Sequence, residues 1–208
     1  MAKQDRAVRT RTALIESAAA LFDSEGYELA SLSTISERAG VSSGALHFHF
    51  TSKAALAEAV GQAAVQRLEG ITRPQVDDAL QALIDVTHAL VRALDDDVVL
   101  RAGFGLSDSI ERVRVAAGLR DKWQGWVEDS LGQADREGAL ASEGAAQDAA
   151  TALVAVTAGL ETLGRQDEWW LSHAPLTRFW QLILPRLAEP SRLDVLVASG
   201  SKGGAPGL

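Results

Sequence analysis

One stretch of twenty residues, 31–50, constrains the fold of this 208-residue chain more than any other. Ser31 stands where a helix N-cap is expected, and Gly40 stands where that helix must end in a left-handed residue. Ser42 can then cap a second helix that runs toward Phe48. Two helices joined by a short turn that contains Gly form a helix-turn-helix, whose second helix enters the major groove of DNA. An ordinary helical hairpin is the alternative interpretation of the same residues.

The side chains between these caps have the sizes that close packing of the two helices requires. Leu32, Ile35 and Ala39 recur at helical spacing and predict a buried face on the first helix. Ser36 is small enough to let the second helix approach, and Val41 is expected to fill the corner between the helices. The pattern therefore favours the helix-turn-helix.

The rest of the chain also shows helical spacing of apolar residues, with no alternating strand pattern, internal repeat or Gly-rich phosphate loop. We therefore expect an all-α fold. The predicted helices cover residues 6–24, the two helices of the motif, a segment between Ser52 and Gly70, residues 76–94, a segment capped by the Asp residues 95–97, residues 119–137, 145–163 and 176–187, and a short helix that begins at Pro190; residues 107–119 are left unassigned.

Composition excludes several classes of protein. The chain has no Cys, so it can form neither a disulfide nor a thiolate nucleophile nor a Cys-based metal site. No apolar run reaches the roughly 18 residues that a membrane span needs, and the N-terminus does not have the apolar core of a signal peptide. We expect a cytoplasmic protein without a membrane partner.

The charge of the chain is unevenly distributed. The formal net charge is −8, which is unusual for a DNA-binding protein. Within residues 1–15, however, Lys3, Arg6, Arg9 and Arg11 outnumber the single acidic Asp5. A local basic cluster matters more for DNA binding than the total charge, although solvation of the surface alone would also explain four charges.

The first fifty or so residues resemble the tetracycline-repressor (TetR) family. This resemblance rests on Leu21-Phe22, Gly26-Tyr27, Ala39-Gly40-Val41-Ser42, Gly44-Ala45-Leu46, Phe48-His49-Phe50 and Ser52-Lys53. It implies a helix-turn-helix domain of three helices, residues 1–52, followed by a larger helical domain for ligand binding and dimerisation, residues 53–199. We expect the tail, residues 200–208, to be disordered.

A narrower resemblance is to the γ-butyrolactone autoregulator receptors of streptomycetes. It rests on residues 44–50 and on the segment Val99-Leu100-Arg101-Ala102-Gly103. It implies a homodimeric repressor without a cofactor, which binds double-stranded operator DNA and is released by a small γ-butyrolactone-like effector. A pseudo-receptor that responds to an antibiotic or a biosynthetic intermediate is an alternative. A helical enzyme or carrier remains as a further alternative, but no catalytic motif supports an enzyme.

The resemblance also implies which residues contact DNA. The sequence departs from the family at two positions of the recognition helix, where Ser43 replaces Lys and His47 replaces Tyr. Base preference therefore should not be copied from relatives. A metal site at His47 and His49 is disfavoured, because residues two apart diverge on a helix. The predicted DNA-binding residues are Arg6, Ser42, Ser43, Gly44, His47, Phe48, His49 and Lys53.

The predicted effector site is apolar and aromatic. Trp123 and Trp126 lie three residues apart on one helical face, which core packing alone would also explain. A ligand pocket needs apolar walls and a few polar groups, and the receptors named above use a Trp in this helix to cover the lactone. We expect Trp123 as the main wall residue, with Trp126, Val99 and Thr157 as further candidates, and no metal or catalytic residue.

Overall fold

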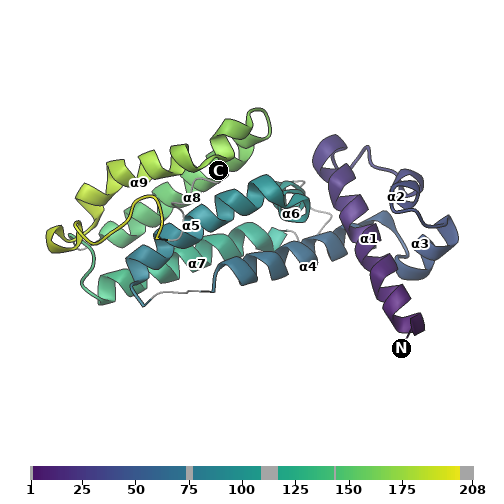
Figure 1. Ribbon diagram of the computed structural model, residues 1–208, viewed down its shortest axis with the longest axis horizontal. Helices are drawn as coiled ribbons and strands as arrows, with labels where there is room; N and C mark the ends of the chain where they lie inside the picture. Colours follow the sequence, from purple (N-terminus) through teal and green to yellow (C-terminus); the bar gives the residue numbers. More distant parts are fainter. Residues whose placement is uncertain (1, 74–76, 109–116, 143, 202–208) are drawn as a thin grey trace, which may run out of the picture. The chain divides into compact units, whose positions relative to one another are not determined.

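The computed structural model describes residues 2–73, 77–108, 117–142 and 144–201. Within these ranges the chain is built from helices, and its only β-type pairing is an isolated bridge between Leu140 and Ala188. The predicted all-α fold is therefore confirmed. No described helix is both long and apolar enough to cross a membrane. The α-helices are α1 (Ala2–Glu25), α2 (Leu32–Arg38), α3 (Ser43–His49), α4 (Lys53–Ile71), α5 (Ala79–Asp96), α6 (Val98–Asp108), α7 (Ala117–Arg136), α8 (Ala145–Gly164) and α9 (His173–Leu187), with 3-10 helices η1 (Glu168–Leu171) and η2 (Pro190–Arg192) (Figure 1).

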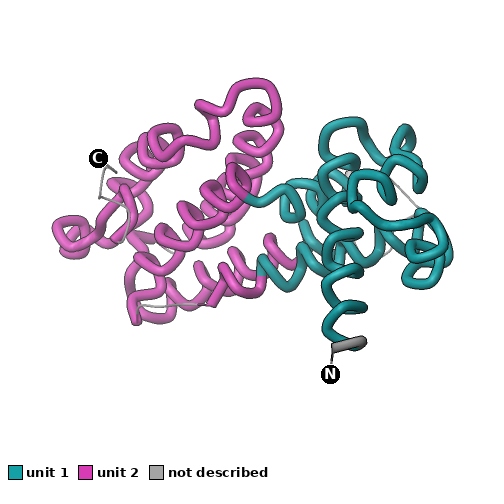
Figure 2. The backbone as a smooth tube through the Cα atoms, turned by 45° about the vertical axis from the view of Figure 1, so that its right-hand side comes forward, with its two compact units in different colours: residues 1–68, 97–121 teal, residues 69–96, 122–208 magenta. Residues whose placement is uncertain are grey.

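The helices form two compact units (Figure 2). The first contains residues 1–68 and 97–121, and the second contains residues 69–96 and 122–208. The first unit thus extends beyond residue 52 and includes α6, because α6 packs along α1. The division of function at residue 52 concerns which residues bind which partner, and it remains a prediction.

Two cross-connections hold α6 in the first unit. The Nε of Arg101 on α6 lies 2.9 Å from the Oδ2 of Asp23 on α1, and both side chains are largely buried. Asp97 caps α6 by accepting hydrogen bonds from the backbone N–H groups of Val99 and Leu100, as the sequence predicted for the acidic run. The same carboxylate forms an ion pair with Arg67 of α4 at 2.7 Å. One side chain therefore both starts α6 and ties it to α4.

The second unit is organised around α5. This helix packs against α8, α9 and η1. Trp180 of α9 is almost fully buried, and its indole N–H donates a 3.0 Å hydrogen bond to the hydroxyl of Thr87 on α5. At the end of α8, Gly164 faces Leu171 of η1 so closely that a Cβ there would lie 2.4 Å from the Leu171 side chain. A larger residue at this position would therefore require the buried Leu171 side chain to move.

The C-terminal segment, residues 197–201, lies along the polar side of α5. Gln81 binds both the N–H and the carbonyl of Val197, and the ring of His88 hydrogen-bonds the carbonyl of Ala198 at 3.0 Å. The N–H of Ser201 donates to Asp85. The first two residues of the predicted disordered tail are thus held on α5, whereas residues 202–208 lie outside the described residues.

Two histidines meet under this segment. The rings of His88 and His173 are stacked with centroids 4.5 Å apart, and His173 bonds the carbonyl of Ser199 at 2.7 Å. Burial lowers the pKa of His88 below its usual value, and the neighbouring charges of His173 and Arg92 lower it further. The hydrogen bond to Ala198 and the charge of Asp85 oppose this shift. Burial therefore favours the neutral form of His88, in which only one ring nitrogen can donate.

The helix boundaries agree with the predicted ones to within a few residues; helix α9, for example, runs from His173 to Leu187. The 3-10 helix Glu168–Leu171 was not predicted, and Asp167 caps it through its side chain. The unassigned segment 107–119 is divided between the end of α6 and the start of α7, and residues 109–116 lie outside the described residues.

Candidate DNA interface and effector site

The turn between α2 and α3 has the geometry that its residues predict. Gly40 has a φ of 65°, which only glycine adopts at little cost. The N–H of Val41 then donates to the carbonyl of Ser36 at 3.0 Å, and Ser36 is buried. The hydroxyl of Ser42 accepts a 3.2 Å hydrogen bond from the N–H of Ala45 and caps α3. The predicted helix-turn-helix is therefore confirmed as a structural motif.

Helix α3 directs one residue inward and several outward. Leu46 is completely buried and anchors the helix. On the outer side Ser43, Gly44 and His47 are exposed, and Phe48 is 81% exposed. An exposed aromatic side chain at the end of such a helix can contact a thymine methyl group or a sugar. The structure thus places the predicted contact residues of α3 on one solvent-facing surface.

The end of α3 carries a short aromatic run. His49 is half-buried, and its ring meets the ring of Phe48 edge to face with centroids 5.3 Å apart. Phe50 is buried, and the guanidinium of Arg11 on α1 lies 5.3 Å from its ring centroid. Arg11 therefore belongs to the packing of α1 against the end of α3. Arg6, which lies five residues before Arg11 on α1, is exposed.

Lys53, one of the predicted DNA-binding residues, has its ammonium group bound inside the protein. Its ammonium group donates hydrogen bonds to the carbonyls of Tyr27, Glu28 and Ala30 at 2.8, 3.1 and 3.1 Å. It also lies 4.6 Å from the centroid of the Tyr27 ring, within cation–π distance. These partners could not be predicted from the sequence, because backbone carbonyls leave no signal in a residue pattern.

Three of the predicted effector-site residues meet in the second unit. The indole N–H of Trp123 donates a 3.0 Å hydrogen bond to the hydroxyl of Thr157 on α8, and both residues are buried. Trp126, which is half-buried, stacks on Trp123 with ring centroids 5.4 Å apart. The hydroxyl of Thr157 in turn donates to backbone carbonyls of its own helix. The arrangement joins a flat apolar wall to one polar pair, which suits a small lactone as well as a tightly packed core.

Val99, the fourth predicted effector residue, belongs to the other compact unit. It is completely buried at the start of α6, where its N–H is bonded to Asp97. Val99 thus belongs to a different compact unit from the tryptophan pair.

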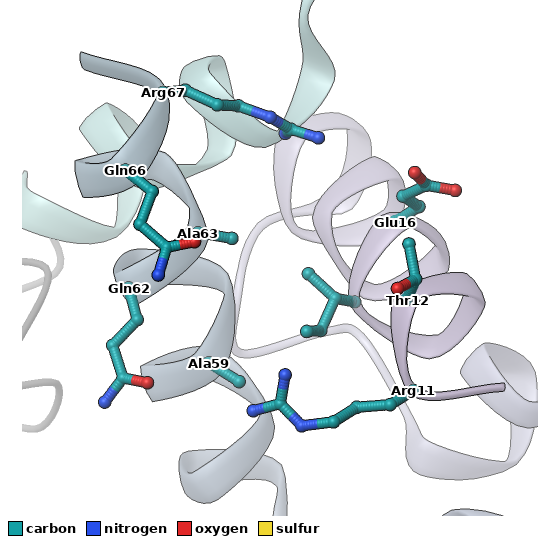
Figure 3. Close-up of a pocket in the computed structure, with 9 residues that line it drawn as sticks. Arg11, Thr12, Glu16, Ala59, Gln62, Ala63, Gln66 and Arg67 are labelled. Atoms are coloured by element: carbon teal, nitrogen blue, oxygen red, sulfur yellow. The ribbon is translucent and has the colours of Figure 1, made fainter. Parts of the chain in front are cut away.

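A surface trough of about 360 Å³ runs between α1 and α4 in the first unit (Figure 3). Its sides carry Arg11, Thr12 and Glu16 from α1 and Gln62, Gln66 and Arg67 from α4, over Ile15, Ala59 and Ala63. Most of these polar side chains are exposed, and Arg67 is already paired with Asp97. A small-molecule site normally encloses most of its ligand, so this open trough does not have the form of an effector pocket.

Comparison with known proteins places this geometry in a family. Residues 14–60 match the sequence pattern of "Bacterial regulatory proteins, tetR family". Over 196 residues the chain is 34% identical to the A-factor receptor protein of Streptomyces griseus, a match that covers 91% of this chain and 68% of that protein. The chain belongs to the tetR family of bacterial regulatory proteins. The family consists of regulators rather than enzymes, which agrees with the interpretation of the sequence.

Solved structures of the family extend the likeness to both units. A crystal structure of a γ-butyrolactone receptor (ArpA-like protein) has a TM-score of 0.80 and 27% identity, covering 93% of this chain and 96% of that one. The TetR family protein CprB from S. coelicolor A3(2) has a TM-score of 0.76 and 26% identity, covering 91% and 95%. CprB in complex with its biological operator sequence has a TM-score of 0.75 and 28% identity, covering 91% and 94%. The resemblance drawn from the sequence motifs is confirmed.

Proposed function

We propose that this tetR-family chain is a homodimeric repressor that binds a roughly palindromic operator and leaves it when a γ-butyrolactone-like molecule binds. The observation that carries the proposal is the capped, solvent-facing helix α3 in a chain that resembles γ-butyrolactone receptors over nine-tenths of its length. As a regulator of bacterial genes it would act in the cytoplasm.

Helix α3 would supply the contacts that read bases. His47 and Phe48 are exposed at its outer side and would reach base edges and thymine methyl groups. Ser43, Gly44 and the cap Ser42 lie at its N-terminus, where free backbone N–H groups favour a phosphate. Arg6 would contribute a phosphate contact from α1, and the partly buried His49 would support Phe48 through their edge-to-face contact.

The effector would bind against the wall formed by Trp123 and Trp126. The polar pair of Trp123 and Thr157 could then exchange its internal hydrogen bond for one to a lactone carbonyl. Val99 is retained as a weaker candidate, because it lies at the start of a helix that is tied to α4 through Asp97. In this division of function residues 1–52 bind DNA, and residues 53–199 bind the effector and the second protomer.

Selection of binding sites from a random duplex library tests this proposal. The selected site should consist of two inverted half-sites whose centres lie about one helical turn, roughly 34 Å, apart, with one dimer bound per site. Adding synthetic γ-butyrolactones should release the labelled site. Release by an antibiotic or a pathway intermediate instead would favour the pseudo-receptor alternative. Failure to select any sequence would contradict the proposal.

A further inference from the structure

Lys53 uses its whole hydrogen-bonding capacity inside the protein. An ammonium group has three N–H donors and no acceptor. Three backbone carbonyls, those of Tyr27, Glu28 and Ala30, lie within 2.8 to 3.1 Å of its nitrogen. The ring of Tyr27 adds a cation–π contact at 4.6 Å. A phosphate could therefore be bound only at the expense of one of these carbonyls.

Lys53 and its carbonyl partners lie on opposite sides of the helix-turn-helix in the sequence. Tyr27, Glu28 and Ala30 lie between the end of α1 and the start of α2, and Lys53 is the first residue of α4. The whole helix-turn-helix, residues 31–52, lies in the loop of chain between the two sides of this contact. One side chain therefore joins the segment that enters the motif to the helix that leaves it.

We propose that Lys53 is a positioning residue, which locks the helix-turn-helix to the first turn of α4, and that it is not a phosphate contact. The inference rests on the proposed function, because the position of α3 matters only if α3 reads an operator. With the lock intact, a shift of α4 moves α2 and α3 as one body. Without it, the two motif helices can pivot about the loop that contains Gly26, whose φ is 83°.

The two roles of Lys53 predict different responses to salt. A side chain that neutralises a phosphate contributes about 0.9 to the slope of log affinity against log salt and acts on all sequences alike. A positioning residue leaves the slope unchanged and acts on the specific complex, in which base contacts need α3 at a set angle. Lys53→Met keeps the aliphatic length and removes the three donors, so it separates the two.

The experiment uses the full-length protein, the site selected by the wild type, and a random-sequence duplex of equal length. We expect Lys53→Met to weaken binding to the selected site about tenfold or more, to change binding to the random duplex less than about twofold, and to leave the salt slope unchanged. Arg6→Gln is the matched control, because Arg6 is an exposed cation. It should weaken binding to both duplexes by the same factor and lower the slope of log affinity against log salt by about 0.9.

A second variant keeps the test decisive if Lys53→Met folds poorly. Lys53→Arg keeps the positive charge, and a guanidinium group binds a phosphate readily. Its planar geometry, however, does not match three carbonyls that converge on one nitrogen atom. We expect Lys53→Arg to weaken binding to the selected site at an unchanged slope. We also expect faster amide hydrogen exchange across residues 31–50 without DNA.

A slope lowered by about 0.9 in Lys53→Met, or wild-type affinity and exchange in Lys53→Arg, would overturn the proposal. If the wild type selected no DNA, the proposed function would fail, whereas the exchange measurement would still decide whether Lys53 locks the motif.

Discussion

Replacing Gly103 with Ala should push α6 away from α4. A Cβ at residue 103 would lie 2.3 Å from the Cβ of Ala64 and 3.1 Å from the Cδ2 of Leu119. Carbon atoms in ordinary contact are about 3.5 to 4.0 Å apart, so the distance between the new Cβ and the Cβ of Ala64 must increase by more than about 1 Å. Ala64 is completely buried and has no rotamer to change. The backbone of one helix therefore has to move.

The expected cost follows from two opposing effects. Inserting a methyl group into a packed site costs about 1 to 3 kcal/mol, whereas Ala in place of Gly inside a helix gains about 1 kcal/mol. We therefore expect Gly103→Ala to lower the free energy of unfolding by up to about 2 kcal/mol. Urea unfolding at one fixed protein concentration would show this as a lower midpoint at an unchanged m-value.

Two further variants isolate the steric effect. Gly125 lies inside α7 and has open space where a Cβ would stand. Gly125→Ala should therefore raise the free energy of unfolding by up to about 1 kcal/mol, because Ala favours the helix more than Gly does. Adding Ala64→Gly to Gly103→Ala should restore room at the crossing and give a favourable coupling of about 1 kcal/mol or more. If Gly103→Ala were as stable as Gly125→Ala, the close approach of α6 and α4 would be wrong.

Three more predictions follow from the described contacts. Trp123→Ala should remain on the selected operator but fail to respond to a lactone, at a cost of a few kcal/mol of stability, as measured by operator release and thermal unfolding; normal release at an unchanged lactone concentration would make the ring purely a core residue. Because burial lowers the pKa of His88, the unfolded chain binds a proton at that site more readily than the folded one, so stability should be lost as the pH falls from the usual histidine range through the lowered pKa. The protection of the amides of residues 197–201 from hydrogen exchange, relative to their intrinsic rates, should fall over the same pH range, and this dependence should be weaker in His88→Gln. Asp97→Ala should destabilise the protein by about 1 to 2 kcal/mol, because it removes a helix cap and an ion pair, whereas Arg67→Met should cost less than about 1 kcal/mol in urea unfolding; equal losses would refute the capping role.

Local signals predicted the helices well because their ends are chemically marked. Ser31, Ser42 and Asp97 cap the helices that the sequence assigned to them, and Gly40 has the positive φ expected of it. The 3-10 helix at residues 168–171 was missed, since it is a short element whose position depends on packing against α8 and α9. The grouping of α6 with α1 was also beyond the sequence, because it depends on contacts between residues far apart in the chain.

The candidate site likewise has features that the sequence predicted and features that depend on the fold. The family resemblance assigned His47 and Phe48 to DNA contacts, and the structure leaves both exposed on α3 beside the buried Leu46, whose inward direction was not predicted. Spacing alone also put Trp123 and Trp126 on one helical face, but it predicted neither the stacking of their rings nor the hydrogen bond from Trp123 to Thr157 on another helix. The environment of Lys53 could not be predicted, because its partners are carbonyls of a loop whose path depends on the fold.

The central claim is that effector and operator bind to opposing states of one protein, and reciprocal titration tests it most directly. A lactone that releases the selected operator is first identified, and the operator affinity is then measured with and without saturating lactone. The lactone affinity is measured with and without saturating operator, for instance by Trp fluorescence. Linkage requires both affinities to fall by the same factor, about 5- to 150-fold for a coupling of about 1 to 3 kcal/mol. A lactone affinity that is unchanged by operator DNA would contradict the account.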